Sequence, residues 1–444
     1  MVEKDHKGRV MQTSLHVIAN AARRDKRKRF RSLYSLFNRV LLKEAFRKLN
    51  RKSASGIDEV TWKEYESNLD ENLVNLEERL KQKRYWPRYV KRVFIPKPDG
   101  KDRPLGIPVL EDKIVQQLLA DILMALYEPL FLDCSYAYRP KRSAKQAVSA
   151  LHYNIQQAYT WVVEADIKGF FDHIDHDWLL RMVEKRVNDR ALIGLISRFL
   201  KSGIKLPDGT TEYPEKGTPQ GGVVSPVLAN IYLHYVLDLW FERKVKTQGQ
   251  GQALLVRYAD DFVTAFRYHG DAARFYRELG PRLAKFGLEL SMEKTRKLQF
   301  NRFKKDLSET FVFLGYEFRR TVSNRSGKDI VTTVMCRKKV RQTVNAFSLW
   351  CKEHRNKRIA WIMGKVKAKL TGIRNYFNLP SNYRRLKEVR TLFQRKLYFW
   401  LNRRSERKSY NVKTFNVMWN QFLEKKPRSL ANEGVQTNFL SCML

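Results

Sequence analysis

Three aspartates have settings that suit them to hold metal ions: Asp166 and the adjacent pair Asp260 and Asp261. Residues 160–164 have the composition of a short strand, which ends at Asp166. The pair lies in the middle of residues 254–266, between two apolar arms that predict a β-hairpin with the acids at its tip. The sequence therefore predicts carboxylates at one strand end and one hairpin tip.

Carboxylates that converge from different strands are the ligands that a pair of Mg²⁺ ions needs. Phosphoryl transfer to a nucleotide uses two ions about 3.5–4 Å apart, one activating the attacking hydroxyl and the other holding the leaving pyrophosphate. Mg²⁺ takes an octahedral shell of oxygens and commonly only one or two protein carboxylates. Paired acids are also ordinary turn residues, so the tetrapeptide at 258–261 alone leaves a simple turn as the alternative.

Further segments of the chain occur in an order that is specific. They are IPKPDGKDRPLGIP at 95–108, SYAYRP at 135–140, EADIKGFFD at 164–172, GTPQGGVVSP at 217–226, LSMEKT at 290–295 and FLGY at 313–316. With these segments the chain resembles reverse transcriptases of the group II intron type, specifically the bacterial reverse transcriptase/maturases that lack an endonuclease domain. The resemblance covers roughly residues 55–320.

The resemblance implies a role for each matching residue in metal and triphosphate binding. Two Mg²⁺ ions would be held by Asp166, Asp260, Asp261 and the backbone carbonyl of Ile167. Lys97 and Arg103 match the positions that clamp the incoming triphosphate, which agrees with their charge on a hairpin-like loop.

Three other residues match positions near the nucleotide. Phe171 would crowd the sugar 2′ position and favour deoxynucleotides; otherwise it is a core phenylalanine. Gln220 would lie near nucleotide and template; otherwise its segment is a flexible loop before a helix. Lys294 would lie near the substrate phosphates; otherwise it is a surface lysine. His173 and His176 resemble a metal cluster, but helix capping explains them better.

The charge of the chain predicts a polyanionic partner. Its 444 residues include 86 Lys and Arg against 46 Asp and Glu, a net charge of +40. Residues 21–52 carry 13 basic and 2 acidic side chains, and residues 337–408 carry 22 and 3. Solvated helix faces are the alternative, but interleaved aromatic side chains add stacking platforms and favour nucleic acid.

Hydrophobic patterning indicates an α+β fold. Helices are expected over residues 32–49, 111–130 and 143–157 and from a cap near Asp177, with extended segments at 93–96 and 103–108 around a turn at 97–100. A strand is expected at 311–318, followed by a helical, basic region poor in strands. The four cysteines form no close pair, and no apolar run could cross a membrane, so a reducing, cytoplasmic location is expected.

These features predict a right-hand polymerase with fingers, a palm built on an antiparallel sheet, and a thumb, followed by an α-helical, basic maturase-like region. The expected divisions are a basic extension at 1–55, fingers and palm at 56–320, and a thumb and RNA-binding region at 321–444. The C-terminal region resembles the maturase part of group II intron proteins; a thumb that only grips template and primer is the alternative.

The expected function is RNA-directed DNA synthesis from an RNA template, a DNA or RNA primer and dNTPs, with binding and splicing of structured intron RNA. Three alternatives stay open: a freestanding reverse transcriptase in DNA repair or phage defence, an RNA-binding maturase without polymerase activity, and an RNA-templated RNA polymerase. The sequence leaves the cognate RNA, the priming mechanism and the oligomeric state undetermined.

Overall fold

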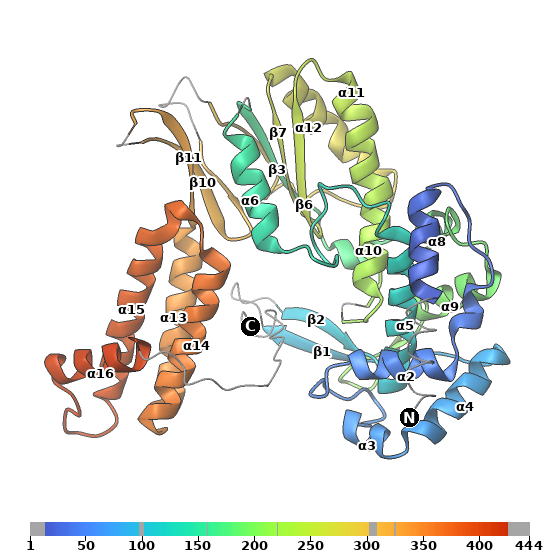
Figure 1. Cartoon of the computed structure of the whole chain (residues 1–444), viewed down its shortest axis with the longest axis horizontal. Coiled ribbons are helices and arrows are strands. Elements are labelled where there is room, and N and C mark those ends of the chain that lie inside the picture. Colours follow the sequence, from blue (N-terminus) through green and yellow to red (C-terminus); the bar gives the residue numbers. More distant parts are fainter. Residues whose placement is uncertain are drawn as a thin grey trace. The chain divides into compact units, whose positions relative to one another are not determined.

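The fold is described from a computed structural model (Figure 1) that covers residues 14–96, 102–157, 159–219, 221–301, 309–323 and 326–424. Helices and sheets are mixed, in agreement with the predicted α+β class. The described residues of Met1–Pro96, Gly100–Ala147 and Ala158–Gln299 form one unit, and those of Val148–Gln157 and Phe300–Leu444 form a second. Each unit is described by itself.

The N-terminal part of the first unit is helical. Residues 14–24 are helical, and the elements that follow are η1 (Leu33–Leu36), α2 (Arg39–Lys48), α3 (Trp62–Ser67) and α4 (Leu69–Lys81). The helix predicted over 32–49 is confirmed for Arg39–Lys48, but it is not continuous from residue 32. The chain breaks at Asn38, whose side chain accepts a hydrogen bond from the Leu41 N–H and caps α2, because Asn satisfies a helix N-terminus better than it continues a helix.

A four-stranded sheet follows, in the order β2-β1-β4-β5. Its strands are β1 (Val90–Pro96), β2 (Asp102–Ile107), β4 (Ile204–Lys205) and β5 (Thr211–Glu212). β1 and β2 pair antiparallel, with Ile95 opposite Arg103, so the predicted hairpin is confirmed. The turn at 97–100 lies outside the described residues.

A second four-stranded sheet carries the acidic residues, in the order β6-β7-β3-β8. It contains β3 (Trp161–Asp166), β6 (Ala253–Tyr258), β7 (Asp261–Phe266) and β8 (Arg296–Gln299). All its pairings are antiparallel. The predicted strand end at Asp166 and the predicted hairpin at 254–266 are both confirmed.

Helices of the first unit pack around these sheets. They are α5 (Leu110–Tyr127), α7 (Phe170–His173), α8 (His176–Glu184), α9 (Arg190–Leu200), α10 (Ser225–Leu233), α11 (Lys246–Gln248) and α12 (His269–Ala284), while α6 (Ala144–Ile155) spans the division between units. The expected cap at Asp177 is wrong, because the Asp175 carboxylate accepts from the Trp178 N–H and caps α8. α10 continues without a break into two π-helical segments, η2 (His234–Asp238) and η3 (Phe241–Val245).

The second unit has a three-stranded sheet, β9 (Phe311–Phe313), β10 (Tyr316–Val322) and β11 (Asp329–Met335), and the helices α13 (Arg337–His354), α14 (Ile359–Phe377), η5 (Pro380–Asn382), α15 (Tyr383–Leu401) and α16 (Val412–Glu424). The single strand predicted over 311–318 is wrong. Leu314 and Gly315 both have positive φ and turn the chain between β9 and β10, as a two-residue hairpin loop requires.

The strand β11 contradicts the expectation that residues beyond 318 lack strand signals. Its run of β-branched residues from Ile330 to Val334 is the signal that predicts a strand there. Cys134, Cys336 and Cys351 are free, in agreement with the cysteine spacing. Within the ranges given above, no helix is long and apolar enough to cross a membrane.

Candidate active site

Asp166 and Asp261 are paired on two neighbouring strands of the second sheet. Asp166 is the last residue of β3 and Asp261 the first of β7, and the antiparallel register pairs them directly. Directly opposed residues on neighbouring strands have Cβ atoms about 4.5–5.5 Å apart. Two residues that are 95 positions apart in the sequence therefore present carboxylates at one edge of the sheet.

The β6–β7 turn adds the third acid. Ala259, which precedes Asp260, has a φ of 57°, a left-handed conformation that alanine adopts only at a cost. This backbone conformation reverses the chain within two residues, so Asp260 and Asp261 follow Tyr258 without a longer loop. The sheet edge thus carries all three aspartates that the sequence singled out.

The chain just beyond Asp166 is fixed to the segment before β8. The Ser291 N–H donates to the carbonyl of Asp166 at 2.9 Å, and the Lys168 N–H donates to that of Glu289 at 2.9 Å. Between them Ile167 is buried and forms a bridge to Leu290. The role of the Ile167 carbonyl as a metal ligand stays a prediction.

Lys294 lies against Asp166. Its ammonium nitrogen is 2.7 Å from a carboxylate oxygen of Asp166, and this hydrogen bond raises the pKa of Lys294 above its usual value. The structure thus brings Lys294 to the acids, as its candidate role requires, but as a partner of a carboxylate. A metal ion bound at Asp166 would compete with the Lys294 ammonium for that carboxylate oxygen.

Asp260 lies in a setting that disfavours its charge. Burial raises its pKa, the nearby Asp166 raises it further, and Arg103 and Lys294 oppose the shift. The charges of Asp260 and Asp166 therefore repel each other at this edge. Such unbalanced negative charge is what a divalent cation would neutralise.

The donor set suits Mg²⁺ in chemistry, being oxygen only. Across the part of the chain that the structure describes, however, no three Asp, Glu, His or Cys side chains lie close enough together to form a metal-binding cluster. The ion pair with Lys294 occupies one Asp166 oxygen. The fit is therefore by residue type and placement, and metal binding requires these side chains to rearrange.

Arg103 and Tyr138 both interact electrostatically with Asp260. Arg103 is exposed on β2, and its charge acts on Asp260. Tyr138 has a φ of 57°, and burial is the main cause that raises its pKa. Asp260 and Tyr258 raise this pKa further, and Arg103 lowers it. Sequence reasoning gave Tyr138 no role, although it lies within the quoted SYAYRP segment. Lys97 and Gln220 lie outside the described residues, so their roles stay predictions.

Phe171 lies on α7, just after the strand that ends at Asp166. It is half-buried, whereas its neighbour Phe170 is 2% exposed and belongs to the core. The carbonyl of Phe171 accepts a hydrogen bond from the Thr218 N–H at 2.8 Å, which ties α7 to the GTPQGG segment. The role of Phe171 at the sugar stays a prediction.

The histidines near α7 satisfy backbone groups. His173 donates to the Gly169 carbonyl at 2.8 Å, and the buried His176 donates to the Gly217 carbonyl at 2.7 Å. Gly217, whose φ is +86°, lies so close to Asp172 that an added Cβ would meet its carbonyl oxygen at 2.8 Å. The cap of α8 is Asp175 and neither histidine, so His173 and His176 bind backbone carbonyls and do not cap this helix.

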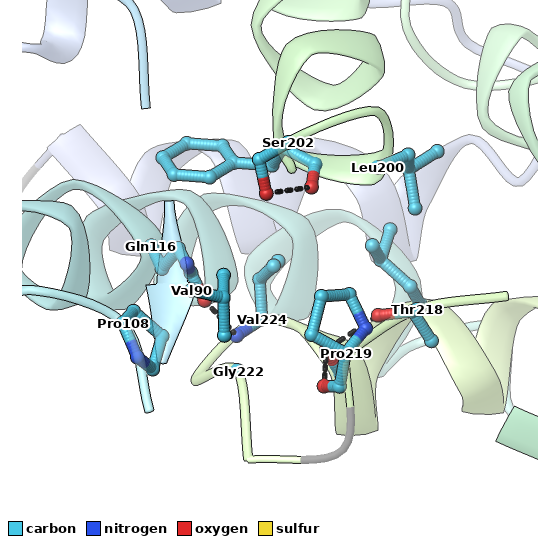
Figure 2. Close-up of a pocket in the computed structure, with 12 residues that line it drawn as sticks. Val90, Pro108, Gln116, Leu200, Ser202, Thr218, Pro219, Gly222 and Val224 are labelled. Carbon is cyan, nitrogen blue, oxygen red and sulfur yellow. Dashed lines mark hydrogen bonds between the residues drawn. The ribbon is translucent and has the colours of Figure 1, made fainter. Parts of the chain in front are cut away.

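A small pocket lies beside the 217–226 segment (Figure 2), with a cavity volume of about 10 Å³. It has room for roughly one water molecule, so it is no nucleotide site. Around it, Gln116 accepts from the Val224 N–H and Ser225 donates to the Pro219 carbonyl. These contacts fix Pro219 and Val224.

Comparison with known proteins finds similarity to reverse transcriptases and to group II intron-encoded proteins. A family model described as reverse transcriptase (RNA-dependent DNA polymerase) matches residues 95–318. The chain is 30% identical to group II intron-encoded protein LtrA of Lactococcus lactis subsp. cremoris over 398 residues, covering 71% of this chain and 65% of LtrA. It therefore spans less than two thirds of that relative.

Two further relatives show how the similarity is distributed. Protein YkfC of Escherichia coli (strain K12) is 30% identical over 310 residues, covering 63% of this chain and 79% of YkfC. An uncharacterized 91 kDa protein in a cob intron of Schizosaccharomyces pombe is 43% identical over 152 residues, covering 34% of this chain and 18% of that protein.

Proposed function

Because the chain belongs to the reverse transcriptase family, we propose that it is an RNA-directed DNA polymerase that extends a DNA or RNA primer on an RNA template with dNTPs. The observation that carries the proposal is the direct pairing of Asp166 with Asp261. With Asp260 in the adjoining turn, three carboxylates stand at one sheet edge. An acid-rich edge beside Arg103 suits a triphosphate bound through metal ions.

In this proposal Asp166, Asp260 and Asp261 hold two Mg²⁺ ions, with the Ile167 carbonyl as a further ligand. The ions when bound would lower the pKa of the primer hydroxyl and neutralise the leaving pyrophosphate. Arg103 and Lys97 would grip the triphosphate by charge. Phe171 would limit the space at the sugar 2′ position.

We assign the β6-β7-β3-β8 sheet to the palm, the β2-β1-β4-β5 sheet to the fingers, and α13, α14 and α15 to the thumb. The boundaries 1–55, 56–320 and 321–444 belong to this assignment. The fingers sheet presents Arg103 on β2 and the palm sheet presents the acids. A cytoplasmic location is part of the same proposal.

Primer extension on an RNA template tests the polymerase activity. The wild type should incorporate dNTPs, and the double variant Asp260→Asn plus Asp261→Asn should lose at least about 10²- to 10³-fold, the usual cost of removing a group that stabilises a transition state electrostatically. Undiminished synthesis by the double variant would refute the assignment. A stable wild type that binds RNA but never extends a primer would favour a maturase without polymerase activity.

We also propose that the second unit binds structured intron RNA and assists its splicing. The 337–408 region, with 22 basic and 3 acidic residues, contains the whole of α13, α14 and α15. Trp350, His354 and Trp361 stack on one another with interplanar angles of 19–21°. Lys365 lies 5.6 Å from the centre of the Trp361 ring.

This cluster of three stacked rings reaches the surface at Trp361, whose side chain is 42% exposed. Bases of unpaired RNA stack on such rings while neighbouring cations neutralise phosphates. The combination supports RNA binding better than charge alone. A matched exposed tryptophan, Trp86, lies in the first unit with Arg198 over its ring and provides the control.

RNA binding should be measured over a salt series with the flanking intron RNA and with an unrelated structured RNA. Trp361→Ala should weaken binding by about 1–3 kcal/mol, the range for a lost base–aromatic stack, and Trp86→Ala should not. Equal affinity for both RNAs would contradict a maturase role. The salt slope counts the phosphate contacts.

A further inference from the structure

Arg257 on β6 is a fully buried arginine three positions before Asp260. Its side chain and that of Asp238 are both 0% exposed, and they pair through two hydrogen bonds of 2.7 and 2.6 Å. A charged side chain in the apolar arm of a hairpin is unusual, because burial of a charge is costly unless it is paired. An apolar residue could fill the same position without this cost, so we asked what the buried charge of Arg257 holds in place.

Every N–H of the Arg257 guanidinium has an acceptor. Besides the two bonds to Asp238, Nη1 donates to the Asn230 side chain at 3.2 Å and to the Ala259 carbonyl at 3.0 Å, and Nη2 donates to the Ser135 hydroxyl at 2.7 Å. Since a guanidinium has five donors, the set is complete. Lysine could not reproduce this fork.

The bond to Ala259 reaches the turn that carries the acids. Ala259 has the left-handed backbone and directly precedes Asp260. Such a conformation persists only where surrounding contacts hold it. The guanidinium supplies one such contact, and its other donors bind Asn230 on α10, Asp238 on η2 and Ser135.

Arg257 also holds the 134–137 segment, through its side chain at Ser135 and through its backbone. The backbone of Arg257 exchanges hydrogen bonds with Cys134 and Tyr136, at 2.7 and 3.0 Å, and Asn230 donates to the Ala137 carbonyl at 2.7 Å. Tyr138, which lies near Asp260, follows directly. One buried arginine therefore joins the acidic turn to the 135–138 segment.

We propose that Arg257, held by Asp238, is a positioning residue that fixes the Ala259–Asp261 turn for catalysis without touching substrate. The proposal rests on the proposed polymerase function. Because misplacement of a reacting group by 1 Å can cost about 10²-fold, loss of the fork should lower kcat rather than weaken dNTP binding.

Arg257→Lys is the main test, and Arg186→Lys is the matched control. Arg186 is also buried and also donates to backbone carbonyls, those of Asp25 and Ala22, but far from the turn in sequence and without a catalytic role here. Two readouts are needed: steady-state primer extension, and hydrogen exchange of the amides at residues 258–262.

Arg257→Lys should lower kcat by about 10²-fold with KM for dNTP nearly unchanged, and should speed exchange at 258–262 by on the order of tenfold or more. Arg186→Lys should do neither. If both variants lose kcat equally at equal stability, or exchange at the turn is unchanged, the proposal is overturned.

A second variant guards against simple misfolding. Arg257→Met plus Asp238→Leu removes both charges at similar volume, a change that often preserves stability. This double variant should fold, show fast exchange at the turn and lose kcat; full kcat would overturn the proposal. If the wild type extends no primer, the polymerase function fails, and the exchange data alone decide whether Arg257 holds the turn.

Discussion

The ammonium of Lys294 lies 2.7 Å from a carboxylate oxygen of Asp166. The pair places a protein cation on an oxygen that the proposed function gives to a metal ion. Lys294 is therefore a competitor for divalent cations when substrate is absent, and an available partner for phosphate once a metal displaces it.

Lys294→Met should tighten Mn²⁺ binding to the nucleotide-free protein by about 1.4- to 5-fold, since an exposed ion pair is worth roughly 0.2–1 kcal/mol. Titration calorimetry measures it. Lys168→Met is the matched control, because Lys168 forms an exposed pair with Glu289 at 3.3 Å near the same strand end. Unchanged or weaker Mn²⁺ binding in Lys294→Met would contradict the competition.

Asp260→Asn should stabilise the protein while inactivating it. The pKa of Asp260 is raised from 3.8 in the folded state, so the folded chain binds this proton more tightly than the unfolded chain does. Stability contributed by this group therefore falls as pH rises from about the ordinary carboxyl pKa through the raised value. The neutral amide removes that penalty.

Thermal melting at several pH values measures this effect. The variant should melt higher than the wild type at neutral pH, and the gain should vanish in acid, where both side chains are neutral. Asp271→Asn provides a contrast, because Asp271 accepts the N–H groups of Gln250 and Gly251 and its loss should be destabilising. A lower melting temperature for Asp260→Asn at neutral pH would be inconsistent with the raised pKa.

Phe171→Val should weaken selection against ribonucleotides. If the ring crowds the sugar 2′ position, its truncation should lower the preference for dNTP over NTP by about 10- to 100-fold, the scale of steric discrimination in a pocket. Ratios of kcat/KM for dCTP and CTP measure it. Phe170→Leu should reduce stability and leave the ratio unchanged; an unchanged ratio in Phe171→Val would make this ring a core residue only.

Gly221→Ala should impair dNTP use by displacing β2. Gly221 has a φ of +111°, and an added Cβ would lie 2.4 Å from the Gly106 carbonyl oxygen, three residues from Arg103. We expect kcat/KM for dNTP to fall about 10- to 100-fold. Gly209→Ala has the same left-handed strain, with a φ of +90°, but nothing within 4 Å.

Gly209→Ala should therefore cost some stability and leave dNTP kinetics unchanged. Equal kinetic losses in the two glycine variants would mean that backbone strain, and not the contact with β2, limits the reaction.

Much of the site could be predicted from sequence because its signals are local. Asp166 follows a strand pattern, and Asp260 and Asp261 interrupt a hairpin pattern, so periodicity alone places them at strand ends. That the three meet depends on strand order, which only the ordered motifs predicted, through resemblance. The register of Asp166 with Asp261 had no signal of its own.

What sequence reasoning missed depends on tertiary contacts. The break at Asn38 is a capping choice within an otherwise helical pattern, and β11 has a clear β-branched signal that the surrounding basic residues obscured. Arg257 offered one clue, a charge inside an apolar arm, but its partner Asp238 lies in a π-helical segment with no sequence signature. Only the tertiary ion pair with Asp238 explains why a charged residue is buried at position 257.

In the proposed function the paired carboxylates of Asp166 and Asp261 hold the metal ions for nucleotide transfer. Single-turnover incorporation of one dNTP on an RNA template tests it most directly, with Asp261→Asn compared against Asp208→Asn, a carboxylate whose partner is Thr210 in the β4–β5 turn. Asp261→Asn should slow the step by about 10²-fold or more while primer–template binding is retained, and Asp208→Asn should match the wild type. A wild-type rate in Asp261→Asn would mean that this carboxylate has no part in the reaction.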